Sequence, residues 1–145
     1  MRKPASCFVL LAALTGCGPF LLLPGGELAG NAVEAPATWD LLAGVSTVQV
    51  ETQPEDPYSV NIWVVEMGEV AYIHAGANRS TWVEHLEADP SIRMRVEEDI
   101  YSLRAVRVEV QEEFNRFSDA YEAKFGIRPG NENVGEAYLF RLETP

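Results

Sequence analysis

The chain has 145 residues, of which 47% are hydrophobic and 23% charged, which is enough for one globular domain with a single core. It carries 22 acidic residues against 11 basic ones, a formal net charge of −11 at pH 7. Because an acidic surface repels phosphate backbones, the composition excludes nucleic acid as a partner.

The first residues are typical of an export signal. Two basic residues precede an apolar run that ends in Leu-Thr-Gly-Cys, with the cysteine at position 17. This stretch resembles a bacterial lipoprotein signal, which is cut before a cysteine that then receives lipid. The resemblance implies a signal peptide over residues 1–16 and attachment to a membrane through lipid on Cys17. The alternative is an uncleaved membrane span, but two glycines and Pro19 interrupt the apolar run.

Removing the signal changes the charge and the available chemistry. Without its two basic residues, 9 basic residues face 22 acidic ones, a net charge of −13, so lipid and not a basic patch must hold the domain on a membrane. Cys7 lies in the signal and Cys17 would carry lipid, so the mature domain has no free thiol. Gly18 is not the aspartate that resembles an inner-membrane retention signal. In a bacterium with two membranes we therefore expect the outer membrane, facing the periplasm.

The segment after the cysteine differs in composition from the rest of the mature chain. Residues 17–37 are rich in glycine, proline and alanine, which is typical of a tether, and we expect it to end by docking on the domain. The folded domain is expected over residues 38–145. Its first core contacts are predicted to be Trp39, Leu41 and Leu42.

Most of the domain has the two-residue period of β-strands. Val48 and Val50 fall on one face of the first strand, and a Met-Gly pair at 67–68 indicates a tight hairpin. Glu98-Asp99 indicates another turn. Strands are predicted over residues 45–53, 58–66, 69–75, 92–96, 100–110 and 136–142.

Two helices interrupt the strands. Thr81 and Glu84 have the spacing of a capping box for a short helix that ends near Ala88. A longer amphipathic helix is predicted over residues 112–125, with Gly126 ending it. Its aromatic residues lie three or four apart and are expected to cover the barrel: Phe114, Phe117, Tyr121 and Phe125. The order predicts a mainly β, α+β fold in which six antiparallel strands close a barrel.

From about Trp39 to Leu142 this order resembles the split β-barrel of the flavin-reductase-like proteins. That superfamily includes the pyridoxamine-phosphate-oxidase-like and deazaflavin-dependent nitroreductase-like families. The stretch that carries the resemblance is WVEHLEADP, residues 82–90, with His85 where asparagine is usual. It is followed by a hydrophobic–arginine alternation, IRMRV, over residues 92–96.

The resemblance implies a cofactor phosphate site in the loop before the short helix. A helix N-terminus offers unpaired N–H groups and a partial positive charge, and Arg79 could pair with a phosphate. The alternative is that the same loop only begins a helix. FMN or a deazaflavin is the implied cofactor, and a homodimer with the ligand groove at its interface is the implied assembly. The matching residues are Gly76, Asn78, Arg79, Ser80 and Thr81.

Other chemistry has less support. His74 and His85 could meet, but two histidines without a clear carboxylate partner do not indicate a metal site. The sequence has no Gly-x-Ser-x-Gly elbow, so no catalytic residue is predicted. We expect a small-molecule-binding domain with an unknown ligand. Two alternatives stay open: a flavin- or deazaflavin-dependent oxidoreductase, whose cofactor would supply the redox chemistry, and a cofactor-free envelope protein that binds another protein.

Overall fold

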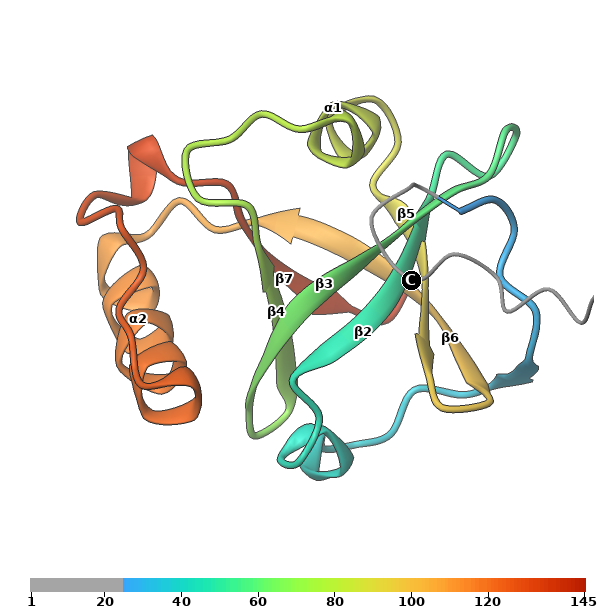
Figure 1. Ribbon diagram of the computed structural model, residues 1–145, viewed down its shortest axis with the longest axis horizontal. Helices are drawn as coiled ribbons and strands as arrows, with labels where there is room; N and C mark the ends of the chain where they lie inside the picture. The colour runs from blue at the N-terminus through green and yellow to red at the C-terminus, as the bar shows by residue number, and fades with distance from the viewer. Residues whose placement is uncertain (1–24) are drawn as a thin grey trace, which may run out of the picture.

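The computed structural model of the chain describes residues 25–145. The expected signal peptide, residues 1–16, and the expected lipidation site, Cys17, lie outside the described residues. Within residues 25–145, no helix combines the length and the apolar character needed to cross a bilayer. The described chain forms a barrel of strands with the longer helix at its side (Figure 1).

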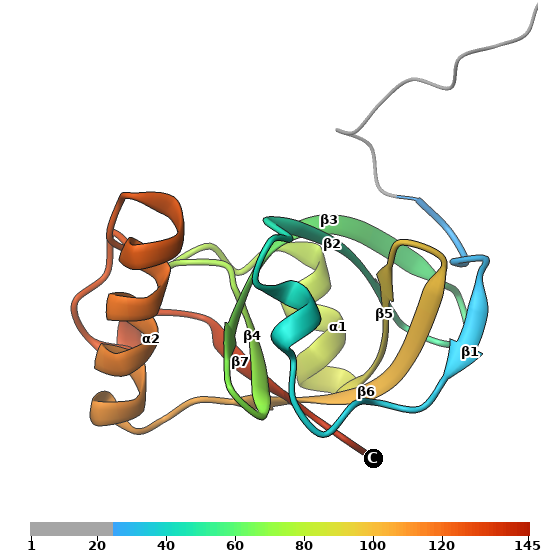
Figure 2. The same ribbon diagram turned by 90° about the horizontal axis from the view of Figure 1, so that it is seen from below.

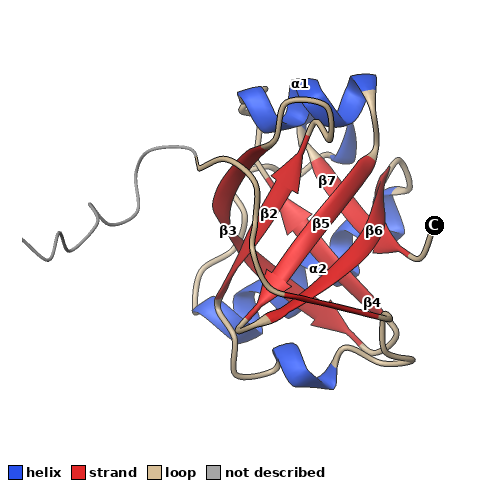
Figure 3. Cartoon of the chain, turned by 90° about the vertical axis from the view of Figure 1, so that its right-hand side faces the viewer, coloured by secondary structure: helices blue, strands red, loops and turns tan. Residues whose placement is uncertain are grey.

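Seven strands form one sheet in the order β1-β6-β5-β2-β3-β4-β7, and β6 also pairs with β7. This second pairing closes six strands into a barrel, which Figure 3 shows with β5 and β6 toward the viewer. Every pairing within the barrel is antiparallel, which confirms the predicted fold class. The strands are β1 (Asn31–Val33), β2 (Thr47–Thr52), β3 (Tyr58–Met67), β4 (Val70–His74), β5 (Ser91–Val96), β6 (Asp99–Arg107) and β7 (Leu139–Glu143).

The two-residue period determines which side chains fill the barrel. Val48 and Val50 of β2 both point into the core, as predicted, where they join Val64, Met94 and Leu103 from three other strands. The side chains between them face outward. Burial of these apolar side chains is the main force that holds the barrel closed.

One end of the barrel is closed by the turn η1 (Asp40–Leu42). Trp39 and Leu42 are buried there, which confirms two of the three expected first core contacts. The expectation for Leu41 is wrong, because the tight 3₁₀ turn directs it away from its neighbours and leaves it 43% exposed.

The short helix α1 (Thr81–Ala88) lies over the barrel near β5 (Figure 1). Trp82 is only 7% exposed and its ring lies 5.8 Å from that of Phe140, so this residue anchors the helix on the barrel. Val83 and Leu86 are buried on the same side of the helix.

The long helix α2 (Gln111–Phe125) packs on the outside of the barrel. Phe114 and Phe117 are buried in a second core with Val65, Tyr72 and Leu139, so the predicted covering role of this stripe is confirmed. The helix ends at Gly126, whose φ of +75° is the left-handed conformation expected after a helix.

Several boundaries differ from the predicted ones, among them both hairpins, the end of β6 at Arg107 and the start of the final strand. The first hairpin turns at Gly68 and Glu69, and the second at Glu97 and Glu98, one residue away from the expected pairs in each case. Gly68 and Glu97 have positive φ, which tight hairpin turns require. The final strand starts later than predicted because a 3₁₀ turn, η2 (Val134–Glu136), occupies its expected beginning.

The segment before the barrel has more structure than a tether predicts. Gly25 bridges to Ser59, and Leu28 is buried against the barrel. β1 then pairs in parallel with β6, a strand that the sequence analysis did not anticipate. Residues 25–37 of the expected tether therefore lie against the barrel.

Candidate functional site

The loop between β4 and α1 contains the five residues expected to hold a phosphate. Gly76 adopts φ of +59°, and its carbonyl accepts a hydrogen bond of 2.7 Å from the backbone N–H of Tyr138. Ala75 donates to the Tyr138 carbonyl at 2.9 Å. These paired bonds fix the loop against the segment that leads into β7. The structure thus brings Gly76, Asn78, Arg79, Ser80 and Thr81 together at the N-terminal end of α1.

Arg79 is turned toward α1, the helix that follows it in the chain. Its Nη1 lies 2.7 Å from Glu84 Oε1, and its Nε donates to Glu87 Oε2 at 3.0 Å. The hydrogen bond to Glu87 is the largest of the effects that raise the pKa of the Arg79 guanidinium. A phosphate would have to compete with two carboxylates for this side chain. The phosphate site in this loop therefore stays a prediction.

The start of α1 also differs from a capping box. Ser80 occupies the N-cap position with extended backbone angles, and its side chain makes no capping hydrogen bond. The predicted Thr81–Glu84 box is wrong, because Thr81 lies inside the helix and Glu84 binds Arg79 instead. The Ser80 hydroxyl is buried without a partner within residues 25–145.

The two histidines contact different parts of the protein. The ring of His74 packs 5.3 Å from that of Phe117, and burial lowers the pKa of His74 to about 4. His85 Nδ1 lies 2.9 Å from Thr52 Oγ1, and its ring meets the edge of Tyr58 at 5.1 Å. Within the described part of the chain, no group of three or more histidine, cysteine or acidic side chains is placed to hold a metal.

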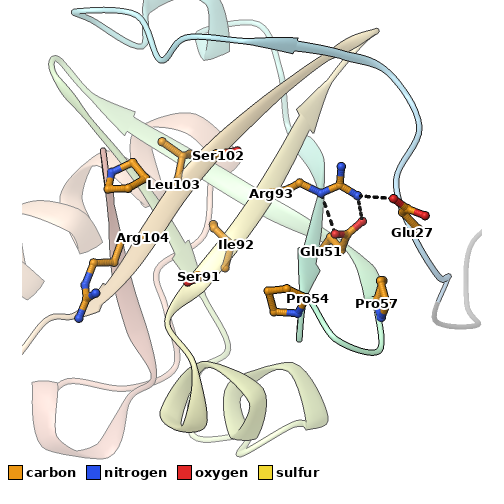
Figure 4. Close-up of a pocket in the computed structure, with 11 residues that line it drawn as sticks. Glu27, Glu51, Pro54, Pro57, Ser91, Ile92, Arg93, Ser102, Leu103 and Arg104 are labelled. Carbon is orange, nitrogen blue, oxygen red and sulfur yellow. Dashed lines mark hydrogen bonds and ion pairs between the residues drawn. The ribbon is translucent and has the colours of Figure 1, made fainter.

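A groove of about 460 Å³ lies at the other end of α1, where the chain enters β5 (Figure 4). The outward-facing side chains of β5 and β6 contribute Ser91, Arg93, Ser102 and Arg104. Their register pairs Arg93 with Ser102 and Ser91 with Arg104, so the four polar groups form two adjacent rows. Apolar lining comes from Pro54, Pro57, Ile92 and Leu103.

The two arginines of the groove have different surroundings. Arg93 donates from Nε and Nη2 to the two carboxylate oxygens of Glu51, each at 2.7 Å, and lies 3.6 Å from Glu27. Burial alone would raise the pKa of Glu51, but hydrogen bonds from Arg93 and from Leu28 N–H outweigh it and lower that pKa. Arg104 makes no ion pair within residues 25–145.

Sequence reasoning missed this groove. The hydrophobic–arginine alternation of β5 was visible, but it identified only the fold. Ser102 and Arg104 also alternate with buried residues, and that alternation is the signal that points them outward. Only the cross-strand register shows that they lie beside Ser91 and Arg93.

Comparison with known proteins supports the fold assignment. No protein-family model and no curated protein matches the chain. A putative pyridoxamine 5′-phosphate oxidase from Listeria innocua matches with a TM-score of 0.56 at 12% identity, over 70% of this chain and 86% of that one. A putative 5-nitroimidazole antibiotic resistance protein from Bacteroides thetaiotaomicron has the same score and identity, over 70% and 74%.

An F420 reductase gives a TM-score of 0.50 at 14% identity, over 77% of this chain and 96% of that one. Identities this low carry information about fold and none about activity. The chain is similar in structure to split-barrel proteins of the pyridoxamine-phosphate-oxidase-like and F420 reductase kinds.

Proposed function

We propose that this chain is a small-molecule-binding split-barrel domain whose ligand occupies the groove between β2, β5 and β6. The groove itself carries the proposal. Its volume of about 460 Å³ lies in the range of small-molecule sites, roughly 300–1,000 Å³. It combines an apolar lining with a few polar groups, which is the usual composition of such sites.

Arg104, the arginine of the groove that makes no ion pair within residues 25–145, favours a ligand with one negative charge. Glu51 already neutralises Arg93, so Arg104 is the cation left to pair with a ligand. Glu27 at the rim would repel a multiply charged phosphate. If the ligand pairs with Arg104 through a carboxylate, Ser91 and Ser102 can donate hydrogen bonds to that carboxylate. The chemistry fits an organic monocarboxylate with an apolar, ring-sized body.

Calorimetric titration of the purified protein tests this proposal. We expect heat of binding with aromatic monocarboxylates. Flavin mononucleotide in the same titration tests the alternative site at the loop. Absence of binding to every aromatic monocarboxylate would contradict the groove as the ligand site.

The second candidate is a flavin- or deazaflavin-dependent oxidoreductase, a proposal by analogy of fold with a putative pyridoxamine 5′-phosphate oxidase and an F420 reductase. A bound flavin would supply the redox chemistry, and the protein would bind and orient it. The visible absorption spectrum of protein purified from its native membrane distinguishes the two. A flavin spectrum supports the oxidoreductase, and a colourless protein removes it.

We further propose that the domain is exported and held on the cell envelope by lipid on Cys17, on the outer membrane if the source has two. The support is the basic start, the apolar run and the Leu-Thr-Gly-Cys stretch. The variant Cys17→Ser should accumulate as unprocessed precursor without lipid label. Normal maturation and labelling of this variant would show the assignment to be wrong.

A further inference from the structure

An exposed aromatic cluster lies where β3 meets the C-terminal end of α2. The ring of Trp63 stacks on that of Phe125, with centroids 4.6 Å apart and an angle of 19°, and lies 6.0 Å from the ring of Tyr121. Despite these contacts, 46% of Trp63 remains exposed. The other two tryptophans of the chain, Trp39 and Trp82, are buried.

Two more exposed apolar side chains belong to segments that adjoin the C-terminal end of α2. Ile127, two residues after α2, is 54% exposed, and Leu41 of η1 lies on the adjoining surface. η1 is held against the end of α2 because Lys124 Nζ donates to the Leu42 carbonyl at 2.8 Å. The aromatic patch is defined as Leu41, Trp63, Tyr121, Phe125 and Ile127.

Charged groups at the edge of the aromatic patch are engaged with one another. Lys124 also binds Glu66, and Arg128 binds both Asp119, at 3.0 Å, and Glu122, at 2.6 Å. Two cations and three carboxylates leave one net negative charge along this edge. Exposed apolar side chains with so little free charge around them are typical of a face that contacts a partner or a membrane.

The path of the chain favours a membrane at the patch. Gly25 exchanges two backbone hydrogen bonds of 2.8 Å with Ser59 at the edge of β3, on the same strand as Trp63 and four residues before it. Four residues of strand span about 13 Å. Figure 2 shows the first described residues, β3 and the C-terminal end of α2 on one side of the molecule.

The expected anchor is close enough to bring this side to a membrane. Cys17 precedes Gly25 by eight residues, a stretch that spans at most about 29 Å. A lipid at Cys17 would thus hold the barrel near the bilayer. The barrel would be held at Gly25, which lies on the same side of the molecule as the aromatic patch. The inference rests on the lipid anchor proposed above.

We propose that the aromatic patch rests on the phospholipid surface to which Cys17 is anchored, with Trp63 at the level of the headgroups. Tryptophan suits this depth because its ring is apolar and its indole N–H keeps a polar partner. The acidic domain is repelled by anionic lipid, so the contact is with zwitterionic headgroups. A protein contact adds to the retention that acyl chains alone provide.

Depth-dependent quenching tests this contact. Full-length lipidated protein is reconstituted into phosphatidylcholine vesicles, with or without bromine on the acyl chains near the headgroups. Because Trp39 and Trp82 are buried in the barrel, bromine should quench the emission of Trp63 and little else. Trp63→Phe keeps an aromatic ring at this position and should abolish that quenching.

Two surface variants sharpen the test. Leu41→Ser combined with Ile127→Ser should lose most of the bromine quenching, because the remaining patch holds the bilayer less closely. Val110→Ser removes an apolar side chain that is even more exposed, at 58%, from the other end of α2 and should leave quenching unchanged.

The outcomes separate the patch from the anchor. Protein that does not float with vesicles has no lipid anchor, and the patch proposal is then wrong together with it. Protein that floats but shows equal quenching in wild type and Trp63→Phe keeps its anchor and overturns the patch contact. Shielding of Trp63 from aqueous acrylamide that depends on protein concentration, without vesicles, would identify an interface between copies and also overturn it.

Discussion

An arginine lies near each end of α1, Arg79 in the loop before it and Arg104 on β6 near its C-terminal end, and the two differ in their ion pairs. At the N-terminal end, Arg79 is held by Glu84 and Glu87. At the other end, Arg104 reaches a groove and makes no ion pair within residues 25–145. A helix N-terminus with a nearby arginine is therefore not enough to identify an anion site. The neighbouring carboxylates decide whether the charge is free to bind.

The largest expected effect on stability comes from removing Trp82, the side chain that holds α1 against the barrel. Trp82→Ala deletes a buried ring beside Phe140, and we expect it to lower the free energy of unfolding by about 3–5 kcal/mol. Urea unfolding measures the change. Val110→Ala, at an exposed position, should stay within about 0.5 kcal/mol of wild type. Equal stability of the two variants would contradict the placement of the helix.

Lowering the pH should lower the free energy of unfolding, through His74 at the end of β4, the strand that leads into the loop before α1. Burial lowers the pKa of His74 from 6.5 to about 4, so the unfolded chain takes up the proton first as the pH falls. The contribution is complete above pH 6.5 and is lost toward pH 4, roughly 3–4 kcal/mol in total for a shift of this size. Urea unfolding at neutral pH and at pH 5 measures it.

Two histidine variants isolate this effect. His74→Phe should remove most of the pH dependence between about 6.5 and 4, because the group that titrates is gone. His85→Gln should keep it, since His85 contacts Thr52 and Tyr58 rather than the aromatic face of α2. An unchanged pH dependence in His74→Phe would show that another group is responsible.

The smallest effect is expected at Ser80. An N-cap serine usually contributes about 1 kcal/mol, but this hydroxyl makes no capping bond and is buried without a partner within residues 25–145. Ser80→Ala should therefore change the free energy of unfolding by less than about 0.5 kcal/mol. Asp89→Ala, which removes the acceptor of the Ser91 N–H, should be the more damaging of the two. A larger loss of stability in Ser80→Ala than in Asp89→Ala would show that the Ser80 side chain caps the helix.

The sequence predicts which side chains are buried better than it predicts which polar side chains pair. Strand alternation identified Val48 and Val50 as core, and helical spacing identified Phe114 and Phe117, because burial leaves a periodic signal. The capping box failed because Glu84 had a second partner in Arg79, five residues before it. Spacing alone cannot choose between two such partners.

The groove could not be predicted for a different reason. Ser91 and Arg104 are far apart in the chain, and the register of β5 against β6 places them side by side. That register depends on the hairpin at Glu97 and Glu98, which the sequence placed one residue too late. A shift of one residue reverses which side chains face outward.

The central claim is that ligand binds at Arg104 and not at Arg79. Titration of an aromatic monocarboxylate into Arg104→Gln and Arg79→Gln tests it most directly. We expect Arg104→Gln to weaken binding at least tenfold, since a hydrogen bond to a charged group contributes about 1.5–3 kcal/mol. Arg79→Gln should bind as wild type does, because its guanidinium is engaged with Glu84 and Glu87. Weaker binding in Arg79→Gln with unchanged binding in Arg104→Gln would contradict the account and return the site to the loop.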